Sequence, residues 1–213
     1  DADDIILSET TDALLNILET NTDLVLVYGL QRKVKNLNEI NIFENFDKRN
    51  YTVIHNPIKK AMRNSMFNPS QFLARTELCK KVGGCDERIK FSQEYSLTLK
   101  LSTLGKFAKL NFPTAILPLV APGQISEKKN NQIYRVSKAL ELFLEDNPKL
   151  ESEYKLYAQR RLTARAWRFA KRFKNSSFFS KWFLLYLKGF FYFNSNVLEN
   201  CKHANEIYND FLD

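Results

Sequence analysis

The sequence changes character near residue 127, and this change most constrains what the chain can fold into. Five of its six glycines come before that point: Gly29, Gly83, Gly84, Gly105 and Gly123. After it, apolar residues recur at helical spacing almost to the end of the chain. The 213 residues suffice for one large domain with a helical appendage. We therefore expect two parts, residues 1–126 and residues 127–213, of which the second is α-helical.

The first part alternates between patterns typical of helices and patterns typical of strands. The stretch TDALLNILE predicts a helix capped by Thr11, and DLVLVYG predicts a short strand that ends at Gly29. The stretch KFAKLNFPTAILPLV predicts one or two strands around Pro113. Alternation of this kind favours an α/β layer architecture.

The chain begins with clustered carboxylates, Asp1, Asp3 and Asp4. In an extended segment alternate side chains share a face, so Asp1 and Asp3 point the same way and Asp4 lies close beside them. Clustered carboxylates are the ligands that hard cations such as Mg²⁺ or Mn²⁺ prefer, and these ions commonly hold a substrate's phosphates. The alternative is an acidic segment that is solvated or caps the next helix.

A second acidic region lies in the stretch TELCKKVGGCDERIKFSQEYSLTLKLSTLGK. Thr76 is placed to cap a short helix that ends at Gly83. The Gly83-Gly84 pair permits positive φ angles or the close approach of a ligand to the backbone. These features predict a binding loop.

Glu94 follows this loop, in the first turn of a helix that we expect Ser92 to cap. Leu97, Leu101 and Leu104 form an apolar stripe, and Glu94 extends that stripe three residues toward the start of the helix. The helix dipole favours the ionised carboxylate there, so the placement suits a buried general base. The alternative is a glutamate that complements the dipole and stays solvated.

The order and spacing of these motifs over residues 1–126 resemble the second half of the catalytic domain of family 2 glycosyltransferases, which have the GT-A fold. The stretches that carry the resemblance are DADD, DLVLVYG, NPSQFLAR followed by KKVGGCDE, and SQEYSLTLKLSTLGK. It implies a partial Rossmann-like mixed sheet with helices. It also implies an inverting, metal-dependent, hexosyltransferase-like enzyme of polysaccharide biosynthesis, which transfers a sugar from a nucleotide-sugar donor to a lipid-linked or surface-polysaccharide acceptor.

The resemblance also assigns roles to individual residues. The family's Asp-X-Asp motif binds the divalent metal, Mg²⁺ or Mn²⁺, and the sugar nucleotide; it corresponds to Asp1 and Asp3, with Asp4 alongside. The Gly-Gly-X-Asp-Glu loop, which borders donor and acceptor, corresponds to Gly83, Gly84, Asp86 and Glu87. The catalytic base corresponds to Glu94.

The sequence departs from the family pattern at three points. The base is Glu94 where the family usually has Asp, and Ala121 stands where the family often has a metal-binding His. The family's first βαβ units, which hold the nucleotide base, would precede Asp1. We therefore expect these residues to be a fragment of the catalytic domain, with little transfer activity alone.

The second part carries a basic, aromatic stretch. Between Tyr154 and Leu198 there are ten basic residues and no acidic one. Two stripes at helical spacing run side by side in it: Arg161, Arg165, Arg168 and Arg172, beside Leu162, Ala166, Phe169 and Phe173. With the aromatic residues that follow, such a helix suits an anionic membrane surface. One alternative is a helical cap on the catalytic domain with solvated arginines; the other is nucleic-acid binding, although no nucleic-acid motif accompanies the charge.

Two further features bear on location. Three cysteines without metal-ligand spacing are typical of reduced thiols in a cytosolic protein. The most apolar stretch, residues 178–193, is interrupted by Lys181 and Lys188 and is shorter than the ~20 residues of a membrane span. We expect a cytoplasmic enzyme, peripheral at the inner face of the membrane, whose partners are a nucleotide sugar and a glycan or glycolipid. The rival hypothesis is a non-catalytic basic module that binds membrane or nucleic acid.

Overall fold

The computed structural model describes residues 4–35, 47, 50–89, 92–119, 129–190 and 196–211. The chain divides into two compact units. The first comprises residues 1–86 and 93–127, and the second comprises residues 87–92 and 128–213. The main division falls one residue from the expected boundary.

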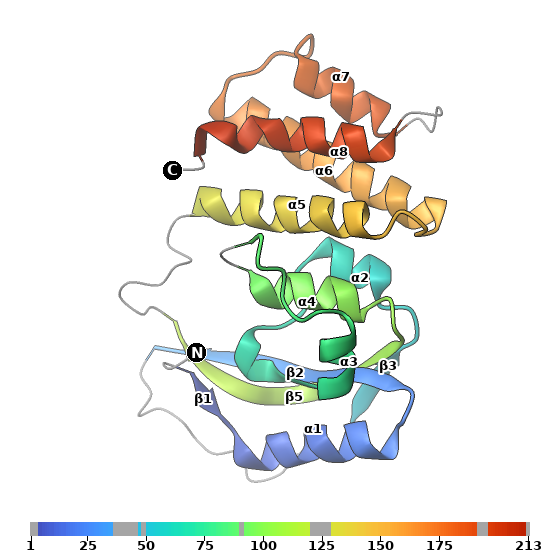
Figure 1. The fold of residues 1–213 in the computed structure, drawn as a ribbon. Helices are drawn as coiled ribbons and strands as arrows, with labels where there is room; N and C mark the ends of the chain where they lie inside the picture. Colours follow the sequence, from blue (N-terminus) through green and yellow to red (C-terminus); the bar gives the residue numbers. More distant parts are fainter. Residues whose placement is uncertain are drawn as a thin grey trace. The chain divides into compact units, whose positions relative to one another are not determined.

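The first unit is built on a mixed five-stranded sheet (Figure 1). Its strands are β1 (Ile5–Ile6), β2 (Leu24–Val34), β3 (Tyr51–Ile54), β4 (Phe72–Ala74) and β5 (Lys106–Pro118). The long strand β5 is parallel to β2 on one side and antiparallel to β1 and β3 on the other, while β4 pairs antiparallel with β2. The expected α/β class is confirmed.

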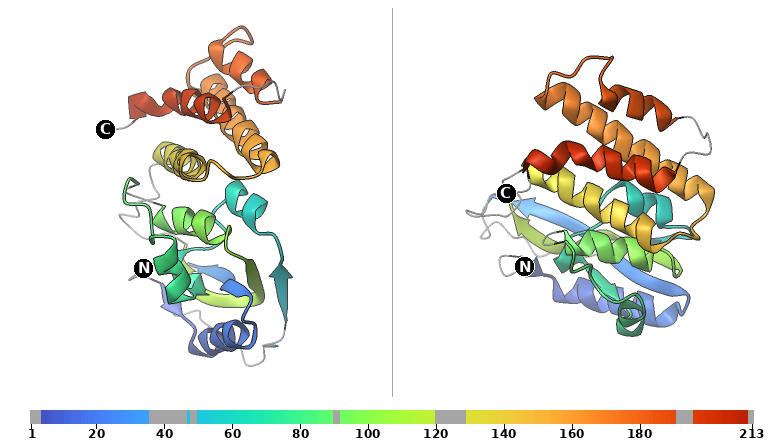
Figure 2. Two further views of the ribbon diagram at one scale, coloured as in Figure 1. Left: turned by 45° about the vertical axis from the view of Figure 1, so that its right-hand side comes forward. Right: turned by 45° about the horizontal axis from the view of Figure 1, so that its top comes forward.

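Helices cover both faces of this sheet (Figures 1 and 2). Helix α1 (Ser8–Thr20) lies on one face, where Leu14 and Ile17 pack with Leu24 and Val27 of β2. The other face carries α2 (Ile58–Arg63), the short 3-10 helix η2 (Pro69–Gln71), α3 (Thr76–Lys81) and α4 (Gln93–Leu101). The first unit therefore has three layers.

Two helix starts differ from the expectation. Helix α1 begins at Ser8 rather than after Thr11, because the Leu7 N–H bonds the carbonyl of Thr114 and ends the extended segment there (3.1 Å). Thr11 donates its hydroxyl back to the Leu7 carbonyl (3.0 Å) and does not cap the helix. Thr76 is likewise the first residue of α3 instead of its cap.

Both strand predictions were correct in place, but the first was too short, and for the second the structure decides between one strand and two. Strand β2 passes through Gly29 and continues to Val34. Strand β5 is one continuous strand through Pro113, which pairs with Leu30 where the register to β2 shifts. A proline is tolerated in a strand at such an irregularity, because it has no N–H to donate to the ladder.

The second unit is helical in all the elements that the structure describes. They are α5 (Lys129–Asp146), α6 (Ser152–Phe173), α7 (Lys181–Lys188), α8 (Val197–Asn205) and the 3-10 helix η4 (Glu206–Phe211). Helix α6 contacts both α7 and α8. Helix α5 ends before Asn147 and Pro148, as the sequence predicts.

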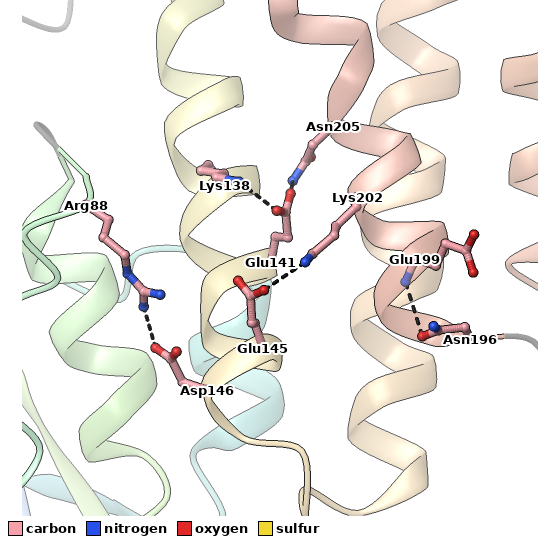
Figure 3. A network of polar contacts seen from close by, with 9 residues as sticks. All are labelled: Arg88, Lys138, Glu141, Glu145, Asp146, Asn196, Glu199, Lys202 and Asn205. Carbon is pink, nitrogen blue, oxygen red and sulfur yellow. Dashed lines mark hydrogen bonds and ion pairs between the residues drawn. The ribbon is translucent and has the colours of Figure 1, made fainter.

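A buried carboxylate joins α5 to the end of α8 (Figure 3). Glu141 is only 3% exposed, and it accepts hydrogen bonds from Lys138 Nζ (2.7 Å) and Asn205 Nδ2 (2.6 Å). An exposed ion pair between Glu145 and Lys202 (2.7 Å) links the same two helices. A buried carboxylate needs such partners, so these contacts specify how the helices pack.

Two further contacts in Figure 3 hold the edges of this unit. Arg88 forms an ion pair with Asp146 at the end of α5, which joins the segment of residues 87–92 to the helices. Asn196 caps α8 by accepting a hydrogen bond from the Glu199 N–H (3.4 Å).

The two stripes of α6 lie partly as predicted. Leu162, Ala166 and Phe169 are buried, but Phe173 is exposed. In the neighbouring arginine stripe, Arg168 and Arg172 are exposed, whereas Arg161 and Arg165 are half-buried. The basic stripe is therefore not a single solvent-facing surface, because α6 packs against neighbours on more than one side. No helix in the described part of the chain is long and apolar enough to cross a membrane.

Candidate functional site

In the first unit, Asp4 lies at the carboxyl edge of the sheet, and Glu94 lies in the first turn of a helix that packs on one face of the sheet. Asp4 precedes β1, whose Ile5 pairs with Ile116 near the carboxyl end of β5. Helix α4 leads through a tight turn into the start of β5, so its first turn, with Glu94, lies at the end of the helix that is away from the start of that strand. Ligands of α/β proteins bind at the carboxyl ends of parallel strands, which makes this edge the candidate site.

Asp4 is half-buried and contacts η2: Ser70 Oγ donates a hydrogen bond to Asp4 Oδ2 (2.6 Å). Asp1, Asp3 and Ala121 lie outside the described residues. Within the described ranges, no three His, Cys, Asp or Glu side chains are grouped to hold a metal ion. The predicted metal site thus stays a prediction, with Asp4 as its one described member.

Gly83 and Gly84 adopt the conformation that the sequence predicts. Their φ angles are 74° and 66°, in the left-handed region that disfavours residues with a β-carbon. A β-carbon added at either position would meet nothing within 4 Å, so the space beside both is open. The loop leaves backbone accessible to a ligand.

Hydrogen bonds fasten this loop to α4. Lys100 Nζ donates to the carbonyl of Gly84 (3.0 Å), and the Asp86 N–H donates to Ser96 Oγ (3.1 Å). The chain therefore runs along α4 from its carboxyl end toward its amino end, where Glu94 lies. Asp86 is buried at this point. Glu87 is exposed and belongs to the second unit.

Glu94 is half-buried, and burial raises the pKa of its carboxyl above the ordinary value. Burial also raises the pKa of the Cys85 thiol, with a further increase from Glu94 and a decrease from Lys100. The Leu97 and Leu101 side chains of the predicted stripe do pack into the core. Glu94 thus has the environment of a carboxylate that accepts a proton more readily than one in water.

A cleft of about 560 Å³ beside β2 was not predicted from the sequence. Its lining comes from β2, α2, the segment before η2, and β5: Tyr28, Gly29, Leu30, Gln31, Lys60, Ser65, Met66, Phe67, Asn68, Gln71 and Lys109. Two lysines and no acidic residue are among these residues. The Tyr28 and Phe67 rings lie in contact, 5.1 Å between centroids, and form an aromatic wall.

Burial raises the pKa of Tyr28 to about 12, so its hydroxyl stays protonated at neutral pH. The cleft therefore combines cationic groups, neutral hydrogen-bonding groups and an aromatic surface. This combination suits an anionic ligand with a ring. The sequence signals that could have indicated it are the Tyr-Gly pair inside a buried strand and the Asn-Pro-Ser-Gln turn.

Helix η2 connects this cleft with Asp4. Ser70, which contacts Asp4, lies between Asn68 and Gln71, and both of these line the cleft. Asn68 Nδ2 donates to Gln31 Oε1 (2.8 Å), and Gln71 Nε2 donates to the Gly29 carbonyl (3.1 Å). The carboxylate and the cleft wall are thus held by one short helix.

No protein-family model matches this sequence, and no curated protein sequence matches it significantly. The functional argument therefore depends on the residues, their order in the chain and the geometry described above.

Proposed function

We propose that this chain is part of the catalytic domain of an inverting, metal-dependent glycosyltransferase of the family 2 type. The observation that carries the proposal is the half-buried carboxylate of Glu94, whose pKa is raised by burial, in the first turn of a helix that packs on the sheet. The Gly83-Gly84 loop, hydrogen-bonded along the helix of Glu94, supports it. So does the order of these motifs along the chain.

In this proposal Glu94 is the general base. It accepts the proton of an acceptor hydroxyl as the hydroxyl oxygen bonds to the anomeric carbon of the donor sugar. The bond from that carbon to the phosphate oxygen breaks, and the nucleoside diphosphate leaves, so the anomeric configuration is inverted. The half-buried position and raised pKa of Glu94 suit a proton acceptor.

Binding of the donor would use both the aspartates and the cleft. A divalent cation, Mg²⁺ or Mn²⁺, held by Asp1, Asp3 and Asp4 would offset the charge of the leaving diphosphate. Lys60 and Lys109 supply positive charge in the cleft, where an anionic ligand can also meet the Tyr28 ring. The proposed acceptor is a lipid-linked or surface polysaccharide at the cytoplasmic face of the membrane.

The test is the Glu94→Gln variant of the full-length enzyme that the resemblance implies. Glutamine keeps the size of the side chain but cannot take a proton, so turnover should fall on the order of 10² to 10⁴-fold. Donor affinity should not change, because the aspartates and the cleft are intact. Glu94→Asp, which introduces the family's usual residue, should be much milder.

The exposed Glu19 of α1 offers a matched control, because Glu19→Gln removes the same charge from a solvated position outside the proposed site. Near-normal turnover for Glu94→Gln would move the base to Asp86 or Glu87. A full-length protein that neither binds a sugar nucleotide nor transfers sugar would favour the non-catalytic basic module.

A further inference from the structure

Helix α7 of the second unit is apolar on two opposite sides. Trp182 and Leu185 face inward and are buried. At the end of the helix a β-carbon on Gly189 would lie 2.4 Å from Thr163 Oγ1, so α7 approaches α6 closely there. A helix with one buried side normally has a polar outer side. Helix α7 does not follow this rule.

The outer side of α7 and the turns that flank it carry exposed apolar side chains, among them Phe179, Leu184, Leu187 and Phe190. We call these four residues the α7 patch. Phe179 is 94% exposed and Leu184 is 53% exposed. Exposed apolar residues gathered on one surface mark an interaction site rather than an ordinary solvent-facing surface.

Basic side chains flank α7, and one of them, Lys181, also lies 3.8 Å from the carboxylate of Glu206. Lys181 and Lys188 lie at the two ends of α7, and Lys171 and Arg172 lie near the end of α6; all four are exposed. Some of these cations lie over aromatic rings: Lys181 Nζ is 4.5 Å from the centroid of the Trp182 ring, and the Arg172 guanidinium is 5.3 Å from that of Phe173. Such residues can keep the charge at a polar boundary while their methylene groups cover apolar surface.

The scaffold beneath the patch is well fixed. Ser180 caps α7 by accepting a hydrogen bond from the Phe183 N–H (3.4 Å). The Phe183 ring packs against both Trp167 (5.1 Å) and Phe178 (5.1 Å, edge to face). The outward side chains are therefore presented by a preformed helix, so little ordering is needed when a partner binds.

We propose that the α7 patch docks on the surface of an anionic lipid bilayer, with the four apolar side chains among the lipid and the basic residues at the headgroups. Apolar side chains with a basic rim are what an interfacial membrane anchor requires. A second copy of this chain would bring two basic rims together, which like-charge repulsion opposes. A nucleic acid would pair with the cations but would leave the outward leucines in water.

This surface differs from the arginine stripe of α6 that the sequence suggests, since Arg161 and Arg165 are half-buried. The inference shares with the proposed function only the membrane location. The test of membrane docking measures no sugar transfer. Failure of the docking proposal is therefore distinguishable from failure of the proposed glycosyltransferase function.

The experiment measures binding of the protein to phosphatidylcholine vesicles with and without phosphatidylserine. Vesicle sedimentation gives the affinity, and quenching of tryptophan emission by lipids brominated on their acyl chains gives the contact region. The chain has two tryptophans, Trp167 in α6 and Trp182 in α7. Quenching of tryptophan emission therefore reports on this region alone.

Two double variants separate the contributions. Lys181→Gln with Lys188→Gln should weaken binding to anionic vesicles roughly 30-fold, because each basic residue near such a surface contributes about fivefold. Phe179→Ser with Leu184→Gln should abolish the quenching and most of the binding. Because these side chains are exposed, the fold should not change, and circular dichroism checks this.

Matched controls come from the first unit. Leu15→Gln replaces an apolar residue of α1 that is 46% exposed, and Lys80→Gln with Lys81→Gln removes two exposed charges. Both controls should bind vesicles like the unmodified protein.

Several outcomes would overturn the proposal. One is equal binding with and without phosphatidylserine, and another is unchanged quenching in Phe179→Ser with Leu184→Gln. The unmodified protein could also be a dimer in sedimentation velocity and fail to bind vesicles. If that dimer dissociated in Phe179→Ser with Leu184→Gln, the patch would be assigned to a second copy of the chain. The unmodified protein could instead bind nucleic acid in a gel-shift assay and fail to bind vesicles. If the variant Lys181→Gln with Lys188→Gln then lost nucleic-acid binding, the basic rim would be assigned to nucleic acid.

Discussion

Gly29 occupies a position in β2 where no larger residue fits. A β-carbon added there would lie 2.1 Å from Thr114 Cγ2 and 2.6 Å from Thr114 Oγ1. Thr114 is 1% exposed, and its hydroxyl donates to the carbonyls of Gln71 (3.3 Å) and Leu30 (3.4 Å). Gly29→Ala must therefore either rotate Thr114 away from these carbonyls or separate β2 from β5.

The expected cost follows from these two routes. Overpacking of a core costs about 1–3 kcal/mol. Loss of the Thr114 hydrogen bonds adds about 1 kcal/mol. We expect Gly29→Ala to lower the free energy of unfolding by roughly 2–4 kcal/mol, and the melting temperature by on the order of 10 °C. Urea denaturation and calorimetry measure both quantities.

A second substitution tests the mechanism. Thr114→Ala removes Cγ2 and Oγ1, which are the two closest atoms, so Gly29→Ala with Thr114→Ala should be more stable than the sum of the single changes predicts. The expected coupling is about 0.5–3 kcal/mol. Additive effects, or a Gly29→Ala variant within about 0.5 kcal/mol of the unmodified protein, would refute the steric argument.

Two other predictions concern the first unit. Arg75 donates from Nε to the carbonyl of Leu24 and from Nη2 to those of Leu18 and Asn21, around the end of α1. Arg75→Lys should lower the free energy of unfolding by about 1–3 kcal/mol, since the compact ammonium lacks the two separated donor atoms of the guanidinium. Equal urea midpoints for the two proteins would contradict this. Because burial raises the pKa of Glu94, the folded state binds the proton of this carboxyl more tightly than the unfolded state does. Ionisation of Glu94 should therefore reduce the free energy of unfolding as pH rises from the ordinary pKa of 4.5 through the pKa in the folded state. Glu94→Gln should consequently melt higher than the unmodified protein at neutral pH and lose this advantage below the ordinary pKa; a difference in melting temperature that does not change with pH would rule out the burial argument.

The success of the sequence-based prediction differs between kinds of feature. The end of α5 before Asn147 and Pro148 was correct, because a proline prevents the helix from continuing through its neighbours. The positive φ angles of Gly83 and Gly84 were correct for a similarly local reason. The caps at Thr11 and Thr76 were wrong, because contacts outside the local window decide where the extended chain ends.

In the candidate site, too, the local sequence decided some features and contacts between distant segments decided others. The type of residue at Asp4 and Glu94 indicated the chemistry, and the resemblance indicated their roles. The place of Asp4 at the edge of the sheet depends on the pairing of β1 with β5, which involves residues more than a hundred positions apart. The cleft beside β2 also combines distant segments, so the Tyr-Gly pair and the Asn-Pro-Ser-Gln turn mark parts of its wall but not the cavity that these parts enclose together.

By itself, the sequence determined the α/β class of the first part, the helical second part and the residue types available for the proposed chemistry, because periodicity and turn chemistry act over a few neighbouring residues. Tertiary structure alone decided which of these residues meet. The contact of Asp4 with Ser70, the hydrogen bond from Lys100 to Gly84 and the outward side of α7 all arise when distant segments pack. Burial also decided the state of Glu94, because the pKa of a carboxyl depends on the solvent and charges around it and not on its place in the chain.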